Sequence, residues 1–313
     1  AITFTNKAAS EMKERVGALV GPVAENMWVS TFHSACVKIL RREAAGVGYP
    51  SSFTIYDQAD AIRLTTYVMR DLNIDTKQYP ARGIHSVISK AKNELLNPTA
   101  FQQNAETYAD EQVAEIYREY QKRLLKSAAM DFDDLLCKTV EIFQKDPETL
   151  ERYQNRFLHI LVDEYQDTNP VQNELVIQLS NKNRNVCVVG DQDQSIYAFR
   201  SADIRNIIEF ETKFPDVTVI LLEQNYRSTQ TILDAANAVI SNNLSRKHKK
   251  LWTAGEKGEK IVRYKADDET DEATWITNEI QRLHENDGIP WKDIAVFYRT
   301  NAQSRVIEEQ LVR

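Results

Sequence analysis

The stretch that decides the fold class of this chain reads Leu161-Val162-Asp163-Glu164-Tyr165-Gln166-Asp167-Thr168. A second stretch of the same kind follows it and reads Val189-Gly190-Asp191-Gln192-Asp193-Gln194-Ser195-Ile196-Tyr197. In both, an apolar run ends abruptly in acidic and amide side chains. The runs at 159–162 and 186–189 are too short for helices and do not alternate with polar residues. They therefore predict strands that are buried on both faces of a parallel sheet.

The polar residues that follow these strands predict a ligand site. Open α/β sheets bind their ligands at the carboxyl ends of adjacent strands. The neighbouring carboxylates of Asp163 and Glu164 suit nucleotide hydrolysis, because one can hold Mg²⁺ while the other polarises the attacking water. We therefore expect a protein that uses a nucleoside triphosphate.

The phosphate-binding loop of such hydrolases, G-x-x-x-x-G-K-[ST], does not occur in the 313 residues. The nearest run, residues 255–260, is acidic and lacks the hydroxyl residue, so we expect a plain loop there. The chain also opens without Met on a strand-like run, residues 1–5, and stops inside a helical pattern, residues 304–313. These features predict an internal fragment of a longer protein, with negligible catalytic activity of its own.

Composition excludes some classes of protein. The chain is 42% hydrophobic and 27% charged, as in ordinary soluble globular proteins, and no apolar run approaches the ~20 residues of a membrane helix. Cys36, Cys137 and Cys187 form no C-x-x-C pair, so we expect buried thiols of a reducing cytoplasm. The net charge of −7 argues against a bulk nucleic-acid binder. The basic run 246–250 reads either as a solvated loop or as a phosphate contact.

The pattern along the chain predicts an α/β fold in several parts. Residues 1–54 and 142–221 alternate strands with helices, whereas residues 55–141 read as amphipathic helices inserted between them. Residues 222–313 begin a further α/β unit. Strands are expected at 27–29, 219–222, 260–264 and 294–298. Two helical faces are expected to be buried: Phe32, Ala35, Cys36, Ile39 and Leu40, and Val113, Ile116, Tyr117, Tyr120 and Leu124.

Seven short runs resemble, in order, the motifs of the UvrD/PcrA/Rep family of superfamily 1 DNA helicases, and the resemblance covers essentially the whole chain. They are residues 3–9, 30–34, 130–135, 162–167, 190–197, 225–228 and 298–301. The resemblance implies a RecA-like parallel-sheet domain interrupted by a helical insertion, followed by the start of a second RecA-like domain, with ATP between the two. It also implies ATP-dependent 3′-to-5′ movement along single-stranded DNA, and at single/double-strand junctions, in repair or replication.

The resemblance also implies roles at the ATP site. Asp163 would hold Mg²⁺, and Glu164 would act as the base for water. Gln194 would sense the γ-phosphate or the water, and Arg227 would be an arginine finger from the second domain. Tyr226 would stack near the adenine, although its residue type alone fits a core tyrosine nearly as well. Relative to the family, the chain lacks the phosphate loop, the adenine-contacting glutamine, the second insertion and the late motifs.

Single-stranded DNA is implied as the partner of a second set of residues. The run Tyr197-Ala198-Phe199-Arg200 would stack on bases, with Phe199 standing where the family usually has Trp. Its aromatic side chains could instead fill the core. Further DNA-facing positions implied by the resemblance are Phe4, Thr31, His33 and Asn301. Two alternatives stay open at this point: a non-catalytic single-stranded-DNA-binding module, and the helicase part of a helicase–nuclease.

Overall fold

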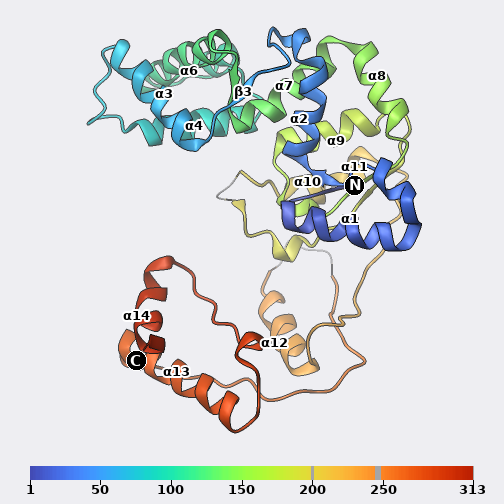
Figure 1. Ribbon diagram of the computed structural model, residues 1–313, viewed down its shortest axis with the longest axis vertical. Helices are drawn as coiled ribbons and strands as arrows, with labels where there is room; N and C mark the ends of the chain where they lie inside the picture. The colour runs from blue at the N-terminus through green and yellow to red at the C-terminus, as the bar shows by residue number, and fades with distance from the viewer. Residues whose placement is uncertain (199–200, 244–247, 313) are drawn as a thin grey trace. The chain divides into compact units, whose positions relative to one another are not determined.

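The computed structural model describes residues 1–198, 201–243 and 248–312 of the chain (Figure 1). The chain forms two compact units, Ala1–Val219 and Ile220–Arg313. No helix in the described ranges is long and apolar enough to cross a membrane. The predicted Phe199 and Arg200, and residues 246 and 247 of the basic run, lie outside the described residues.

A parallel sheet of four strands organises the first unit, in the order β2-β1-β5-β6. Its strands are β1 (Ile2–Thr3), β2 (Ser30–Thr31), β5 (Ile160–Val162) and β6 (Val186–Val188). Ile2 pairs with both Ser30 and Val162, so the first strand lies beside one that follows it by 160 residues along the chain. The parallel pairing of β5 with β6 confirms the prediction that the runs at 159–162 and 186–189 form strands of a parallel sheet. The strand expected at 27–29 begins later, at Ser30.

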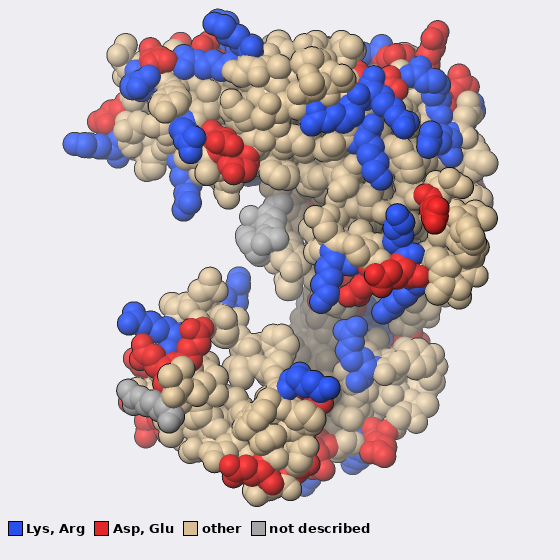
Figure 2. Space-filling model, viewed as in Figure 1, with Lys and Arg blue, Asp and Glu red and all other residues tan. Residues whose placement is uncertain are grey.

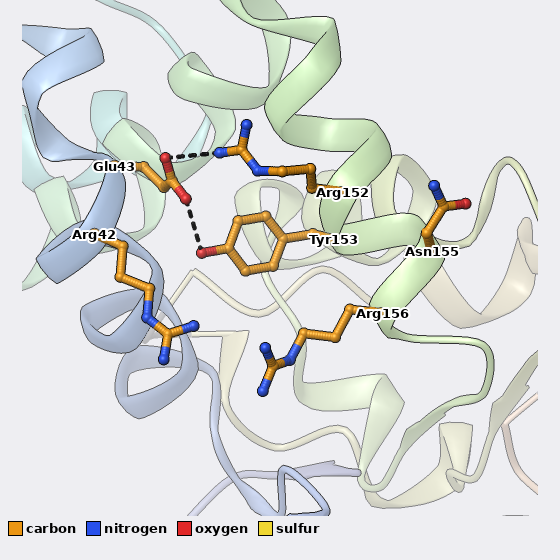
Figure 3. Close-up of a pocket in the computed structure, with 6 residues that line it drawn as sticks. All are labelled: Arg42, Glu43, Arg152, Tyr153, Asn155 and Arg156. Carbon is orange, nitrogen blue, oxygen red and sulfur yellow. Dashed lines mark hydrogen bonds and ion pairs between the residues drawn. The ribbon is translucent and has the colours of Figure 1, made fainter.

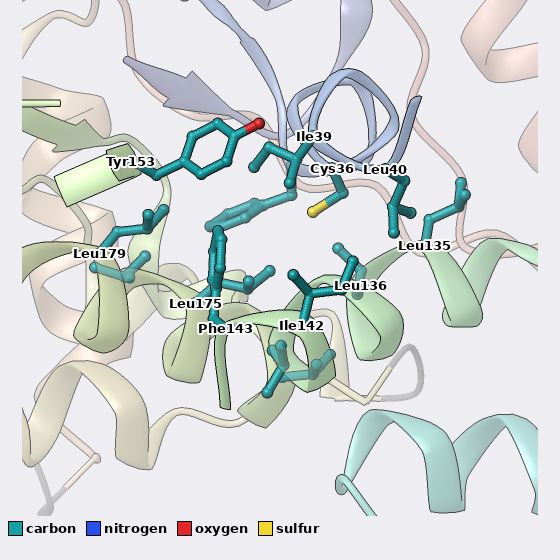
Figure 4. Packing of buried hydrophobic residues seen from close by; sticks show 14 of the residues in the cluster. Cys36, Ile39, Leu40, Leu135, Leu136, Ile142, Phe143, Tyr153, Leu175 and Leu179 are labelled. Atoms are coloured by element: carbon teal, nitrogen blue, oxygen red, sulfur yellow. The ribbon is translucent and has the colours of Figure 1, made fainter. Parts of the chain in front are cut away.

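Helices cover this sheet and build the main core. They are α1 (Asn6–Val20), α2 (Phe32–Glu43), α7 (Phe132–Lys145), α8 (Pro147–Arg156), α9 (Pro170–Ser180), α10 (Arg205–Ile208) and α11 (Phe210–Lys213). Short 3₁₀ turns complete the unit: η1 (Gly21–Asn26), η2 (Ala44–Val47), η3 (Tyr165–Asp167) and η4 (Gln192–Gln194). Figure 4 shows Ile39 and Leu40 of α2 packed near Leu136 of α7 in this core. The predicted face of α2 is buried at Phe32, Cys36, Ile39 and Leu40, while Ala35 is half-buried.

The expectation that β5 and β6 are buried on both faces is wrong. Ile160 and Val162 are buried, whereas Leu161, which points to the opposite face of β5, is 49% exposed. Cys187 at the centre of β6 is exposed, so it is not the buried thiol that we expected. The reason is that side chains of successive strand residues alternate between faces, and only one face of these strands joins the helical core.

The helical insertion has a core of its own. Its helices are α3 (Gln58–Asp71), α4 (Ala81–Asn93), α5 (Pro98–Gln103) and α6 (Tyr108–Lys126). The predicted apolar face of α6 is buried at all five positions, from Val113 to Leu124. Two short strands, β3 (Thr54–Ile55) and β4 (Ala129–Met130), pair in parallel where the insertion leaves and rejoins the first unit. The expected boundary between residues 141 and 142 falls inside α7, whose apolar residues belong to the main core.

The second unit contains helices α12 (Gln230–Ile240), α13 (Glu269–Glu285) and α14 (Asn301–Val312), with a 3₁₀ turn η6 (Trp291–Asp293). The strands expected at 219–222, 260–264 and 294–298 do not form; over the described residues 220–312 the only strand-like pairing is a bridge between Gln224 and Trp252. A strand needs a hydrogen-bonded neighbour, and apolar composition alone does not supply one. Apolar side chains of these runs are therefore exposed to solvent; Val262, for example, is 70% exposed.

Candidate nucleotide and single-stranded DNA site

The Asp163–Glu164 pair lies where β5 ends. The backbone N–H of Asp163 still donates to Ile2 of the neighbouring strand at 2.9 Å. Glu164 then takes a left-handed conformation with a φ of 53°, and the chain turns into η3. A non-glycine residue in this region costs roughly 1–3 kcal/mol, and such strain gathers at functional sites. The turn leaves the Glu164 side chain exposed and that of Asp163 half-buried.

The electrostatics of this pair are those of adjacent carboxylates. Burial raises the pKa of Asp163, and the charge of Glu164 raises it further. A divalent cation beside them would favour the charged form of both, and carboxylate oxygens are the ligands that Mg²⁺ prefers. Within the described ranges no group of three or more His, Cys, Asp or Glu side chains could hold a metal. The adjacent carboxylates of Asp163 and Glu164 fit a cation that is held by one or two carboxylates together with a ligand's phosphates.

The segment after β6 lies against the end of β5. The backbone N–H of Tyr165 donates to Val189 at 2.9 Å, and the N–H of Asp191 donates to the Gln166 side chain at 2.9 Å. Gln194 lies in η4 with its side chain exposed, and its Nε2 donates to Asp191 Oδ2 at 2.8 Å. The predicted sensor thus belongs to the same edge of the sheet as Glu164, while its hydrogen bond goes to Asp191.

Two pairs of aromatic rings lie at this end of the first unit. Phe4, directly after β1, stacks on Tyr197 with ring centroids 6.3 Å apart and planes at 17°. His33, in the first turn of α2, meets the Phe132 ring edge-on at 5.8 Å. Burial lowers the pKa of His33, which favours the neutral ring. The Thr31 hydroxyl caps α2 by accepting from the backbone N–H of Ser34 at 3.3 Å, and it thereby stabilises the start of the helix.

In the second unit, the side chain of Asn225 organises a tight turn before α12. Its Oδ1 accepts from the backbone N–H groups of Arg227 at 2.9 Å and Ser228 at 2.8 Å. The turn presents Tyr226, 85% exposed, and an exposed Arg227. Tyr226 is therefore not the core tyrosine that its residue type also allowed. Asn301 is the first residue of α14 and is exposed.

A hollow of about 420 Å³ lies elsewhere on the first unit, between the last turn of α2 and α8 (Figure 3). It is lined by Arg42, Glu43, Arg152, Tyr153, Asn155 and Arg156. The Glu43 carboxylate accepts from the Arg152 guanidinium at 3.0 Å and from the Tyr153 hydroxyl at 3.3 Å. None of the predicted site residues that the structure describes lines this hollow. Figure 2 shows Lys and Arg side chains interspersed with Asp and Glu on the visible face of the first unit.

Comparison with known proteins gives the family. The UvrD/REP helicase N-terminal domain matches residues 1–215, and the UvrD-like helicase C-terminal domain matches residues 220–313. The chain belongs to the UvrD/REP helicase family. It is 51% identical over all 313 residues to the ATP-dependent DNA helicase PcrA of Bacillus subtilis, and 52% identical to that of Staphylococcus aureus strain Mu50. The chain spans 42% and 43% of the length of these relatives.

Within this UvrD/REP chain, two residues that contact predicted site residues were not predicted from the sequence. Phe132 is 51% exposed beside His33, although it begins a helix whose other apolar residues are buried. By its spacing Phe132 continues the buried stripe of α7, because it lies three and four residues before Leu135 and Leu136, so no signal in the sequence marks its exposure. Gln166, in the turn after β5, is the second such residue. Its amide reaches both Glu164 and Asp191, and nothing in the sequence shows that proximity.

Proposed function

We propose that this chain is part of an ATP-dependent DNA helicase that moves 3′ to 5′ along single-stranded DNA in repair or replication. The observation that carries the proposal is the short path between the two halves of the site. Residues 191–197 begin at a hydrogen bond to Gln166, beside Glu164, and end at the Tyr197 ring that stacks on Phe4. Nucleotide chemistry and base stacking would therefore act on one short segment.

In the ATP site, Asp163 would hold Mg²⁺, and Glu164 would accept a proton from the attacking water. Bound Mg²⁺ would neutralise part of the negative charge on the phosphates. The half-buried Asp163 suits a fixed ligand, whereas the exposed Glu164 carboxylate suits a group that must meet water. Gln194, at the same sheet edge, would hydrogen-bond the γ-phosphate or the water.

From the second unit, Arg227 would stabilise the transferring phosphoryl group and Tyr226 would stack near the adenine. Their support is the turn held by Asn225, which presents both side chains to solvent. A guanidinium presents a rigid fork of donors that matches phosphate oxygens.

On the DNA side, aromatic rings would stack on bases without sequence preference, because every base has a π-face. Phe4 and Tyr197 form one such surface, and His33 with Phe132 forms a second. The proposal extends by family resemblance to Thr31, Phe199, Arg200 and Asn301.

The proposed domain organisation follows the expected one with one change. The expected division has residues 1–54 and 142–221 as the first RecA-like domain, residues 55–141 as the insertion, and residues 222–313 as the start of the second domain. Because α7 packs into the main core, we propose that the insertion ends near Met130 and not at residue 141. A cytoplasmic location is part of the same proposal and is supported by three free cysteines.

Strand separation by the full-length protein tests the proposal. A duplex with a 3′ single-stranded tail should be unwound in the presence of ATP and Mg²⁺, and a duplex with a 5′ tail should not. DNA binding without unwinding or ATP turnover would instead support the non-catalytic module. Equal unwinding of both duplexes would contradict the direction of movement.

A further inference from the structure

Gln166 joins the two strand ends of the site through a single side-chain amide. Its Nε2 donates to Glu164 Oε2 at 2.8 Å, and its Oε1 accepts from the backbone N–H of Asp191 at 2.9 Å. We propose that Gln166 is a positioning residue that fixes the Glu164 carboxylate for proton transfer and ties it to residues 191–197. This inference rests on the proposed function, because it gives Gln166 a part in the same hydrolysis.

The orientation of the Gln166 amide is set by its partners. The N–H of Asp191 is a donor, so it must meet the carbonyl oxygen of the amide. The amino group is then directed at Glu164, where a carboxylate can only accept. Gln166 is 1% exposed, so solvent does not offer the amide other partners. An exchange of its oxygen and nitrogen would place donor against donor and acceptor against acceptor.

Gly190 leaves the space that this amide occupies. A Cβ at residue 190 would lie 2.6 Å from Gln166 Oε1 and 3.1 Å from the backbone nitrogen of Tyr165. Cβ atoms essentially never approach other heavy atoms more closely than 3.0 Å. The glycine after β6 and the glutamine after β5 therefore fit each other, and the contact between the two strand ends depends on both.

Glu164 needs such support because its own surroundings do not fix its side chain. It is exposed and has a left-handed backbone, and an unsupported side chain of this kind samples several rotamers. The hydrogen bond from Gln166 holds Oε2. Oε1 has no hydrogen-bond partner within the described part of the chain and remains available to water. Misplacing a reacting group by about 1 Å can cost on the order of 100-fold in rate.

The same amide links Glu164 to the DNA side of the site. Asp191 begins the segment that carries Gln194 and ends at Tyr197, whose ring stacks on Phe4. A displacement of this segment would pull on Gln166 Oε1, and through the planar amide it would move the donor that holds Glu164. A movement of Tyr197 could therefore change the position of the Glu164 carboxylate through Gln166.

The variant Gln166→Glu tests this inference in the full-length protein. It keeps an oxygen acceptor for Asp191 and replaces the donor to Glu164 with a second carboxylate. We expect the kcat of DNA-stimulated ATP hydrolysis to fall by roughly 10- to 100-fold, with a change in KM of no more than about 2-fold. The acidic limb of the pH profile of kcat should move to higher pH, because adjacent carboxylates resist losing both protons.

The matched control is Gln154→Glu. Gln154 is also buried, at 8% exposure, and its Nε2 donates to the carbonyl of Gln178 at 2.7 Å, so it tests a buried glutamine outside the site. It should leave kcat and the pH profile unchanged. In a Glu164→Gln background, Gln166→Glu should cost no further single-turnover rate, whereas a purely structural role would lower the rate in both backgrounds.

The outcomes separate this inference from the proposed function. If Glu164→Gln hydrolyses ATP at the unmodified rate, the proposed role of Glu164 is wrong, and the positioning role of Gln166 is wrong with it. If Glu164→Gln is inactive while Gln166→Glu keeps the unmodified kcat and pH profile, only the inference about Gln166 is overturned. A shifted profile together with a lowered kcat supports it.

Discussion

The Nζ atom of Lys92 lies 2.7 Å from Oδ2 of Asp131, and both side chains are almost completely buried. Lys92 lies in the last turn of α4 of the insertion, and Asp131 caps α7 of the main core, so this ion pair joins the two parts of the first unit. Asp134 lies 2.9 Å from the same ammonium group, and the hydroxyl of Tyr120 donates to Asp131 at 2.8 Å.

Removing the buried ammonium should destabilise the first unit strongly. Lys92→Met leaves Asp131 and Asp134 buried without their cation, and breaking a buried pair in this way costs about 3–5 kcal/mol. Urea unfolding of the chain measures the change. The control is Lys90→Met, which removes an ammonium group that is 70% exposed and lies 3.8 Å from Glu94. This variant should lose well under about 1 kcal/mol of stability, as is typical of surface ion pairs. Equal losses for both variants would contradict this account.

Asp133 should make stability fall as pH rises. Burial, and then the charge of Asp131, raise the pKa of Asp133 from 3.8 to about 6. Between about pH 4 and pH 6 the folded chain keeps a proton on Asp133 that the unfolded chain has lost. The free energy of unfolding therefore falls by up to about 1.4 kcal/mol for each unit that the pH rises in this range. Asp133→Asn retains an oxygen that can accept from Asn93.

The stability gained by Asp133→Asn should therefore be small near pH 4 and larger at pH 7. Denaturant titrations at both values measure it. A gain that is the same at both pH values would mean that Asp133 does not titrate with a raised pKa.

Phe132 should contribute to the binding of single-stranded DNA. Its ring is 51% exposed beside His33, and loss of a base-stacking ring costs about 1–3 kcal/mol of affinity. Phe132→Ala should therefore weaken binding of a fluorescent oligonucleotide by the full-length protein. Tyr108→Ala, which removes a ring that is 71% exposed at the start of α6, is the matched control and should bind normally. Unchanged affinity for Phe132→Ala would remove this residue from the DNA site.

The 313-residue chain by itself should show negligible ATPase activity. No run of the form G-x-x-x-x-G-K-[ST] occurs in it, so nothing supplies the amides and the lysine that position the phosphates. A phosphate-release assay with Mg²⁺ and single-stranded DNA measures it. Robust turnover by the purified chain would contradict the assignment.

The sequence predicted those elements whose pattern is local. The helical spacing of α2 and α6 gave their buried faces, and the two apolar runs gave the paired strands β5 and β6. It failed where the outcome depends on neighbours in space. Cys187 is exposed although β6 pairs with β5, and among the described residues no strand pairs with the run 260–264.

The same limit applies to the site. The polar residues after β5 and β6 were found because each follows its own strand. The bond from Gln166 to Asp191 depends on how those strand ends meet, and the positive φ of Glu164 depends on the turn between them. Neither feature produces a pattern in the sequence from which it could be predicted.

Hydrolysis of ATP by the Glu164→Gln variant of the full-length protein tests the central claim most directly. The amide keeps the shape of the side chain and cannot accept the proton, so ATP binding should persist while DNA-stimulated turnover is almost abolished. Glu174→Gln, on α9 of the same unit, is the control and should turn over normally. If the Glu164→Gln variant hydrolyses ATP as fast as the control, Glu164 is not the general base, and this account of the site is wrong.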